Sequence, residues 1–173
     1  VELAQQPLLP PLPSRMQPVA EDWDRIGALA DTRGPSLYRF VASQIGTLGL
    51  TDGDIELASV FIDALEPSGW LGADLSDIAL RAGAPLERAE AMLRRLQALE
   101  PAGIFARNLA ESLRLQSADQ GLLTPLFDRL LCHLPLLASA DLPGLARVCG
   151  CALADLRPIL RDLRSLDPKP GTR

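Results

Sequence analysis

The sequence predicts an all-α fold of two helical subdomains, each containing a helix-turn-helix-like hairpin, preceded by a Pro-rich extended arm. The first observation behind this prediction is that apolar residues recur at helical spacing, with Gly and Pro between the runs. The second is an internal repeat: residues 73–101 align without gaps on residues 140–168, and eleven of the 29 positions are identical. We therefore expect an arm over residues 1–35, a first helical subdomain over 36–103 and a second over 104–173.

The N-terminal arm is predicted from its prolines. Residues 1–20 are too rich in them for a helix or a central strand, with Pro7, Pro10, Pro11, Pro13 and Pro18. Such an arm is a linker or, as the sharper alternative, a docking peptide. Trp23 follows in an acidic patch, where we expect it to anchor packing rather than contact a ligand. The Val at position 1 suggests a piece of a longer protein.

Two helices are predicted to open the first subdomain. One begins at Ser36 and keeps its apolar residues, through Ile45, on one side. The other covers residues 55–65, and residues 51–54 offer its N-cap. The two aspartates in that cap also resemble the start of a calcium loop. Since the remaining ligands and the closing Glu are missing, we interpret them as capping residues.

Each copy of the repeat predicts a short helix, a Gly turn and a longer helix. Asp74 and Asp141 are predicted N-caps, because a carboxylate there accepts hydrogen bonds from the free N–H groups of the first turn. In the first copy we expect Gly83 to end the short helix. Pro85 then starts a regular helix that reaches Leu99.

Both copies also place a small residue, a glycine and an aliphatic residue at the spacing typical of helix-turn-helix units. These residues are Ala79, Gly83 and Ala89 in the first copy and Ala146, Gly150 and Leu156 in the second. One interpretation is a pair of units that read DNA. The other is a tight helical hairpin, which needs small residues where its helices cross, and this is the interpretation we favour.

The second subdomain is predicted to contain helical residues at 108–116 and a helix or a pair of helices within 122–137. In its hairpin, Pro158 stands opposite Ala91 of the first copy and cannot donate an interior helical hydrogen bond. We therefore expect that the last helix either starts late, with Asp155 as its cap, or bends at Pro158.

Charge disfavours DNA reading by this chain alone. There are 17 basic and 22 acidic side chains, and the net charge is −5, whereas a DNA-binding domain usually has a basic face. Cations do gather on the long helices of the repeat, where they are candidates for contacts with protein or nucleic acid: Arg88, Arg94 and Arg95 in the first copy and Arg157, Arg161 and Arg164 in the second. Because acidic residues are interspersed among them, we interpret these faces as solvated rather than as phosphate-binding tracks.

Composition and motifs exclude several other classes. Hydrophobic residues make up 47% of the chain and aromatic residues 4%, so the core is expected to be aliphatic. No apolar run is long enough for a membrane span, and no signal peptide is evident, so we expect a soluble protein of the cytoplasm. One His and no Gly-rich phosphate loop or activated nucleophile indicate that the chain is not an enzyme and needs no cofactor.

The cysteines raise the one alternative that involves a metal. Cys132, His133, Cys149 and Cys151 could bind zinc, but neither Cys-His nor Cys-x-Cys is a usual ligand spacing. Cys149 and Cys151 replace alanines that flank the turn glycine in the first copy, and free Cys packs as a small hydrophobic residue. We therefore predict packing cysteines and no metal, with a zinc-stabilised helical scaffold as the alternative.

Three motifs in order resemble one known family. They are L-E-P-S-G-W-L at 65–71, L-Q-A-L-E-P-A-G-I-F-A-R-N-L-A-E-S-L-R-L-Q at 96–116 and L-R-S-L-D-P-K-P-G at 163–171. Together they resemble the core-binding domain of the sigma-54 (sigma-N) bacterial transcription factors. The chain departs from the family's usual motifs at Pro67, Trp70 and Glu100, although Trp70 keeps an amphipathic ring. Nothing resembles the family's activator-responsive or promoter-reading parts.

The resemblance implies a module that binds core RNA polymerase and holds the holoenzyme in a closed promoter complex until an ATP-hydrolysing activator acts. It implies contact with promoter DNA only as part of the full-length factor. The polymerase contacts are expected among Trp70, Arg88, Arg94, Arg95 and Arg107, although Arg107 is also spaced to pair with Glu111. The alternative function is that of a helix-turn-helix DNA-binding regulator.

Overall fold

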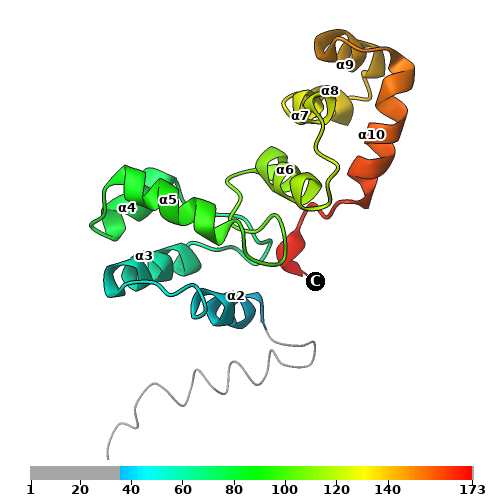
Figure 1. Ribbon diagram of the computed structural model, residues 1–173. Helices are drawn as coiled ribbons and strands as arrows, with labels where there is room; N and C mark the ends of the chain where they lie inside the picture. The colour runs from blue at the N-terminus through cyan, green and yellow to red at the C-terminus, as the bar shows by residue number, and fades with distance from the viewer. Residues whose placement is uncertain (1–35, 173) are drawn as a thin grey trace, which may run out of the picture. The chain divides into compact units, whose positions relative to one another are not determined.

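The computed structural model describes residues 36–172, and this part of the chain is all-α, as predicted (Figure 1). The predicted Pro-rich arm and the acidic patch around Trp23 lie outside the described residues. The helices are α2 (Leu37–Ile45), α3 (Asp52–Asp63), α4 (Leu75–Arg81), α5 (Leu86–Leu96), α6 (Leu109–Asp119), α7 (Pro125–Leu131), α8 (Leu134–Ala138), α9 (Leu142–Cys149), α10 (Leu153–Ser165) and the short 3₁₀ helix η1 (Pro170–Thr172).

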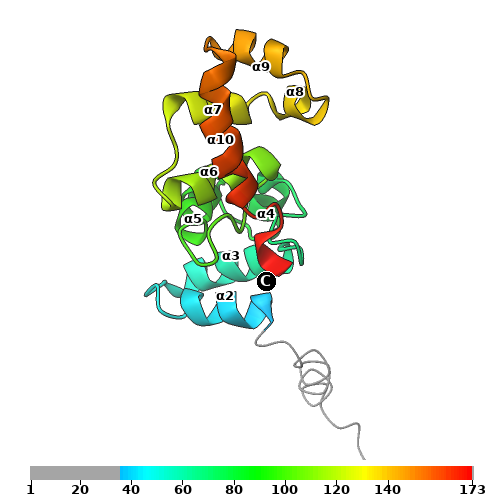
Figure 2. The same cartoon turned by 90° about the vertical axis from the view of Figure 1, so that its right-hand side faces the viewer.

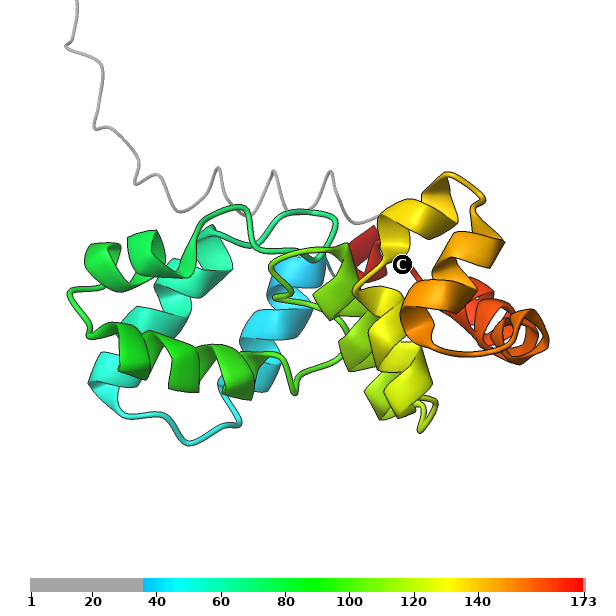
Figure 3. The same cartoon turned by 90° about the horizontal axis from the view of Figure 1, so that it is seen from above.

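Buried apolar side chains form two clusters. The first collects α2 to α5 and continues to Ile104 and Phe105, both fully buried; the Phe105 ring meets the edge of Phe61 at 6.4 Å between centroids. The second collects α6 to α10 around Phe127 and Leu130. Helix α3 lies beside α2, α4 and α5, and α9 lies beside α7, α8 and α10 (Figures 2 and 3). Most core residues of both clusters are aliphatic, as expected, but Phe61, Phe105 and Phe127 are the largest fully buried side chains. The boundary between residues 103 and 104 stays a prediction.

The first copy of the repeat forms α4, a turn and α5. Asp74 is the N-cap of α4 without a side-chain hydrogen bond, and Gly83 takes a left-handed φ of 61° in the turn. Pro85 is the N-cap of α5 rather than its first residue. The helix ends at Leu96, earlier than predicted, because the chain continues in tighter turns, with Leu99 N–H donating to the Leu96 carbonyl at 3.1 Å.

The second copy forms α9 and α10. The Asp141 side chain accepts from Gly144 N–H at 2.8 Å, and Gly150 takes a left-handed φ of 65°. Of the two alternatives for the last helix, the late start is wrong, because α10 begins at Leu153, ahead of Asp155. The bend at Pro158 stays a prediction. Asp155 acts from inside the helix: its carboxylate accepts from Ala152 N–H at 3.0 Å, so the first turn forms before the chain reaches Pro158.

Candidate functional site

The three motifs that carry the resemblance meet in space, although they lie far apart in the sequence. Phe105 N–H donates to the Gly69 carbonyl at 2.8 Å, and Leu71 N–H to the Ala106 carbonyl at 2.9 Å. Gly171 N–H donates to the Ser68 carbonyl at 3.0 Å, which brings η1 onto the same place (Figure 1). We name this meeting point, residues 66–71, 103–106 and 167–171, the motif junction.

Glycine is required at the junction by close backbone approach. A Cβ atom on Gly171 would lie 2.6 Å from the Gly69 nitrogen and from the Pro67 carbonyl oxygen. Gly69 itself has a φ of 93°, a region that other residues rarely enter. The glycines of the first and third motifs are therefore explained by contact with each other.

A buried polar network joins the second motif to the third. The Gln116 amide donates to the Asp167 carbonyl at 2.7 Å, and the Gln116 carbonyl oxygen accepts from Asp167 N–H at 2.9 Å. The same amide reaches Ser112, whose hydroxyl donates to the Gly103 carbonyl at 2.9 Å. Ser112 and Gln116 are 0% and 5% exposed, so these bonds form away from water.

A glutamine side chain also binds the backbone at the end of the first hairpin. Glu100 occupies the position in the first copy that Asp167 occupies in the second. The Gln44 amide of α2 donates to the Glu100 carbonyl at 2.7 Å and accepts from Glu100 N–H at 2.9 Å. Each acid-proline exit of the repeat is thus clamped by a glutamine from another helix. Neither clamp could be predicted from the sequence pattern, because the paired residues lie 56 and 51 residues apart.

Trp70 lies within the junction. Its carbonyl accepts from Glu66 N–H at 2.8 Å, and its backbone forms a bridge with Ala106, the residue before Arg107. The indole Nε1 is buried and has no hydrogen-bond partner within residues 36–172. The fold therefore brings the backbones of the candidates Trp70 and Arg107 close together. The indole nitrogen of Trp70 is shielded from solvent.

Arg107 pairs with Glu111, the alternative already given for it. Its Nη2 and Nε lie 2.8 and 3.0 Å from the Glu111 carboxylate, and its backbone N–H donates to the same group at 2.7 Å. Burial raises the pKa of Glu111, but the hydrogen bonds from Arg107 and Gln97 outweigh it, so the pKa lies below its ordinary value.

The three α5 candidates differ in what their side chains already bind. Arg88 donates from Nη2 and Nε to the Asp54 carboxylate at 2.8 and 3.2 Å, which lowers the pKa of Asp54. Arg95 donates to the Leu48 carbonyl at 3.1 Å. Arg94 is exposed and makes no side-chain hydrogen bond or ion pair with the described residues. Arg94 is therefore the α5 cation left available to a partner.

The α10 candidates are all exposed. Arg161 lies 3.3 Å from Asp162 with its side chain 79% exposed, a weak pairing. Arg157 and Arg164 make no side-chain hydrogen bond or ion pair with residues 36–172. Two of the three cations on α10 are thus open to a partner.

The three cysteines differ in how far they are buried. Cys149 is buried in the second cluster, Cys151 is half-buried and Cys132 is exposed. Burial raises the pKa of the Cys149 thiol. Within the part of the chain that the structure describes, no three His, Cys, Asp or Glu side chains are placed to hold a metal ion.

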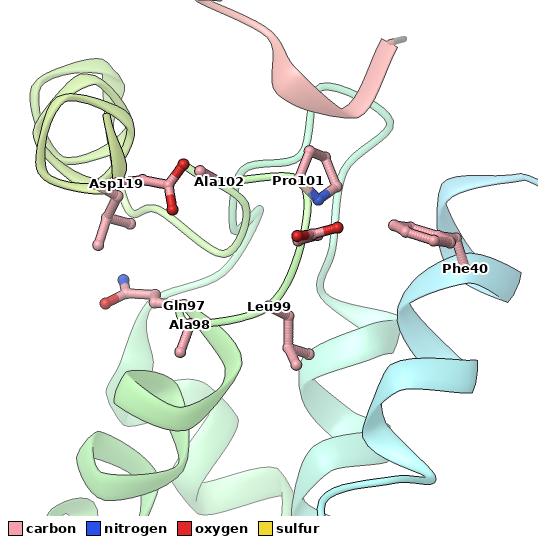
Figure 4. Close-up of a pocket in the computed structure, with 9 residues that line it drawn as sticks. Phe40, Gln97, Ala98, Leu99, Pro101, Ala102 and Asp119 are labelled. Atoms are coloured by element: carbon pink, nitrogen blue, oxygen red, sulfur yellow. The ribbon is translucent and has the colours of Figure 1, made fainter. Parts of the chain in front are cut away.

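Two hollows on the surface differ in character. One, of about 430 Å³, lies beside Glu100 and Pro101 and mixes carboxylate, amide and apolar groups; Figure 4 shows Phe40 of α2 and Asp119 of α6 on opposite sides. The other is an open groove of about 860 Å³ along α6, α8 and the end of α10. Its lining is nearly all apolar, and we call it the apolar groove. The sequence pattern did not predict this groove.

No helix within residues 36–172 is both long and apolar enough to cross a membrane. The comparisons with known proteins agree with each other. The family described as "Sigma-54 factor, core binding domain" matches residues 29–173.

Relatives match most of this chain. The RNA polymerase sigma-54 factor of Cereibacter sphaeroides is 48% identical over 162 residues, which cover 94% of this chain and 37% of that protein. The one of Rhodobacter capsulatus is 44% identical over 151 residues, 87% of this chain and 35% of its own. The chain spans about a third of the length of these relatives. It therefore belongs to the sigma-54 factor family and covers that family's core binding domain.

Proposed function

We propose that the chain binds core RNA polymerase as the docking module of a sigma-54-type transcription initiation factor. The observation that supports this most is the match to the core binding domain over residues 29–173, together with the contacts that join its three motifs. The relatives that carry this region are named RNA polymerase sigma-54 factors. A binding role needs no catalytic centre, and we assign none.

Contact residues follow from which side chains remain available. We propose Arg94 as the main polar contact of α5, because Arg88, Arg95 and Arg107 already pair within the chain. Those three arginines and Trp70 remain candidates at the edge of the same interface. Arg is favoured at protein interfaces since its planar group forms paired hydrogen bonds with carboxylates.

The module has a wider proposed role within the full-length factor. We propose that the module holds the holoenzyme in a closed complex that an ATP-hydrolysing activator opens. The activator and promoter DNA would be contacted through other regions of the full-length factor. We propose a cytoplasmic location on the same ground, since core RNA polymerase is the proposed partner.

The alternative is a DNA-binding regulator that uses one or both hairpins. Arg157 and Arg164, exposed on the long helix of the second hairpin, are the observation in its favour. The net charge of −5 opposes it.

Retention of core polymerase on the immobilised chain, run in parallel with a gel shift on promoter DNA, separates the two functions. We expect polymerase retention and no tight DNA binding. Arg94→Glu should weaken retention by about tenfold, because it reverses an unpaired interface charge. Arg147→Glu, an exposed arginine of α9, is the matched control. Tight, salt-sensitive DNA binding without polymerase retention would refute the proposal.

A further inference from the structure

The apolar groove is built from leucines that the second helical cluster leaves partly open. Leu109 of α6, Leu134 and Leu137 of α8 and Leu163 of α10 line it, above the buried Leu113 and Leu166. The volume of about 860 Å³ accommodates several apolar side chains from a partner. These leucines are only partly buried in this chain, so the cluster is incomplete on this side.

The repeat provides an internal comparison. Leu163 occupies the position in the second copy that Leu96 occupies in the first. Leu96 is 0% exposed within its cluster, whereas Leu163 opens into the groove. The second copy therefore keeps the apolar residue of the hairpin but lacks the cover that the first copy has.

Helix α8 points to the same gap. Its sequence, L-P-L-L-A, is wholly apolar, yet none of its residues is buried. A surface of contiguous apolar side chains on neighbouring elements marks an interaction site, whereas single exposed leucines are ordinary.

The lining restricts the backbone of an occupant. An extended segment would bury N–H and C=O groups against leucines, which offer them no hydrogen bonds. A helix satisfies these groups internally and presents only side chains, as in helix-in-groove recognition. The chemistry of the groove thus selects a helix with an apolar face.

Charge at the groove favours an acidic partner. Arg164 lines the groove, is exposed and makes no hydrogen bond or ion pair with residues 36–172. No Asp or Glu is among the lining residues. A carboxylate beside the apolar face of the incoming helix would pair with Arg164.

We propose that the apolar groove binds an amphipathic helix of core RNA polymerase whose leucine-like face fills the groove and whose acidic residue pairs with Arg164. This inference rests on the proposed function and assigns it a surface distinct from α5. The full factor would then hold polymerase through one face of each hairpin region.

The test measures the affinity of the whole chain for core polymerase in solution. Leu137→Asp puts a carboxylate among the leucines, and Arg164→Glu reverses the rim charge at a residue outside the core. Leu137→Asp should weaken binding by about tenfold or more, as expected for a central interface residue. Arg164→Glu should weaken it by about fivefold, because the reversed charge would repel the carboxylate of the partner. Leu80→Asp, at a leucine 81% exposed on α4, and Arg147→Glu are the matched controls and should bind like the unchanged chain. Circular dichroism confirms that each variant is folded.

A photoreactive residue at position 138, exposed at the edge of the groove, identifies the occupant. A crosslink to a helical segment of a polymerase subunit is the expected result. Groove variants that bind as well as the controls, or a crosslink to a second copy, to the chain itself or to a non-helical segment, would overturn the inference while the proposed function stands. Failure of the unchanged chain to bind polymerase would overturn both.

Discussion

Replacing Gln116 by Leu tests how much the buried hydrogen bonds between α6 and the third motif contribute to the stability of the fold. The substitution removes the two hydrogen bonds to the Asp167 backbone, at 2.7 and 2.9 Å, and the bond to the Ser112 hydroxyl. Because Gln116 is 5% exposed, water cannot easily replace those bonds. The third motif would lose its link to α6.

The expected loss follows from those bonds. Taking a partner away from a buried polar group costs about 1–3 kcal/mol for each group. Because Asp167 is only half-buried, the expected loss in the free energy of unfolding for its two backbone groups together is about 2–4 kcal/mol, toward the lower end of that range. For a chain of this size, the melting temperature should fall by about 5–15 °C.

Gln44→Leu is the control, because Gln44 clamps Glu100 with the same two bonds at an exposed site. Water can take over there, so the loss should stay below about 1 kcal/mol. Thermal and urea unfolding followed by circular dichroism measure both variants. Equal losses for Gln116→Leu and Gln44→Leu, or no loss for Gln116→Leu, would refute the reasoning.

Three other outcomes are expected. The pKa of Glu111 is lower in the folded state than in the unfolded state, so the stability that its carboxylate contributes is present above the unfolded pKa and is lost as pH falls through the folded pKa. Glu111→Gln should therefore flatten the acid side of a plot of the free energy of unfolding against pH. An unchanged acid side would contradict this. Pro158→Ala should raise the free energy of unfolding by about 1–2 kcal/mol, since Ala can donate inside α10, and a lower value would show that α10 depends on the proline. Gly171→Ala should cost more than about 2 kcal/mol because its Cβ would strike backbone, whereas Gly83→Ala meets open space and should cost about 1 kcal/mol; thermal melts that reverse this order would refute the account of the junction.

The fold class and both hairpins could be predicted because their signals are local. Asp141 caps the helix that follows it, and Gly83 and Gly150 take the left-handed turns that only glycine adopts easily. The predicted late start of α10 was wrong for an equally local reason: Asp155 is the third residue of the helix rather than its N-cap. Sequence propensity identifies a side chain that can cap a helix more readily than it identifies the residue at which the helix starts.

The contacts that organise the candidate site are long-range, and the sequence pattern did not reveal them. Gln116 and Asp167 are 51 residues apart, and Arg88 finds its carboxylate 34 residues away. An arginine on a helix predicts exposure but not whether another element supplies a partner. The apolar groove had one signal, the all-apolar L-P-L-L-A run, which reads equally well as a buried helix.

Titration of core RNA polymerase with the chain, in competition with the full-length factor, tests polymerase binding most directly. We expect a one-to-one complex that the full-length factor displaces, with weakened binding for Arg94→Glu and Leu137→Asp. A chain that is folded yet forms no complex with core polymerase, or one whose complex coexists with the full-length factor on the same polymerase, would contradict this function.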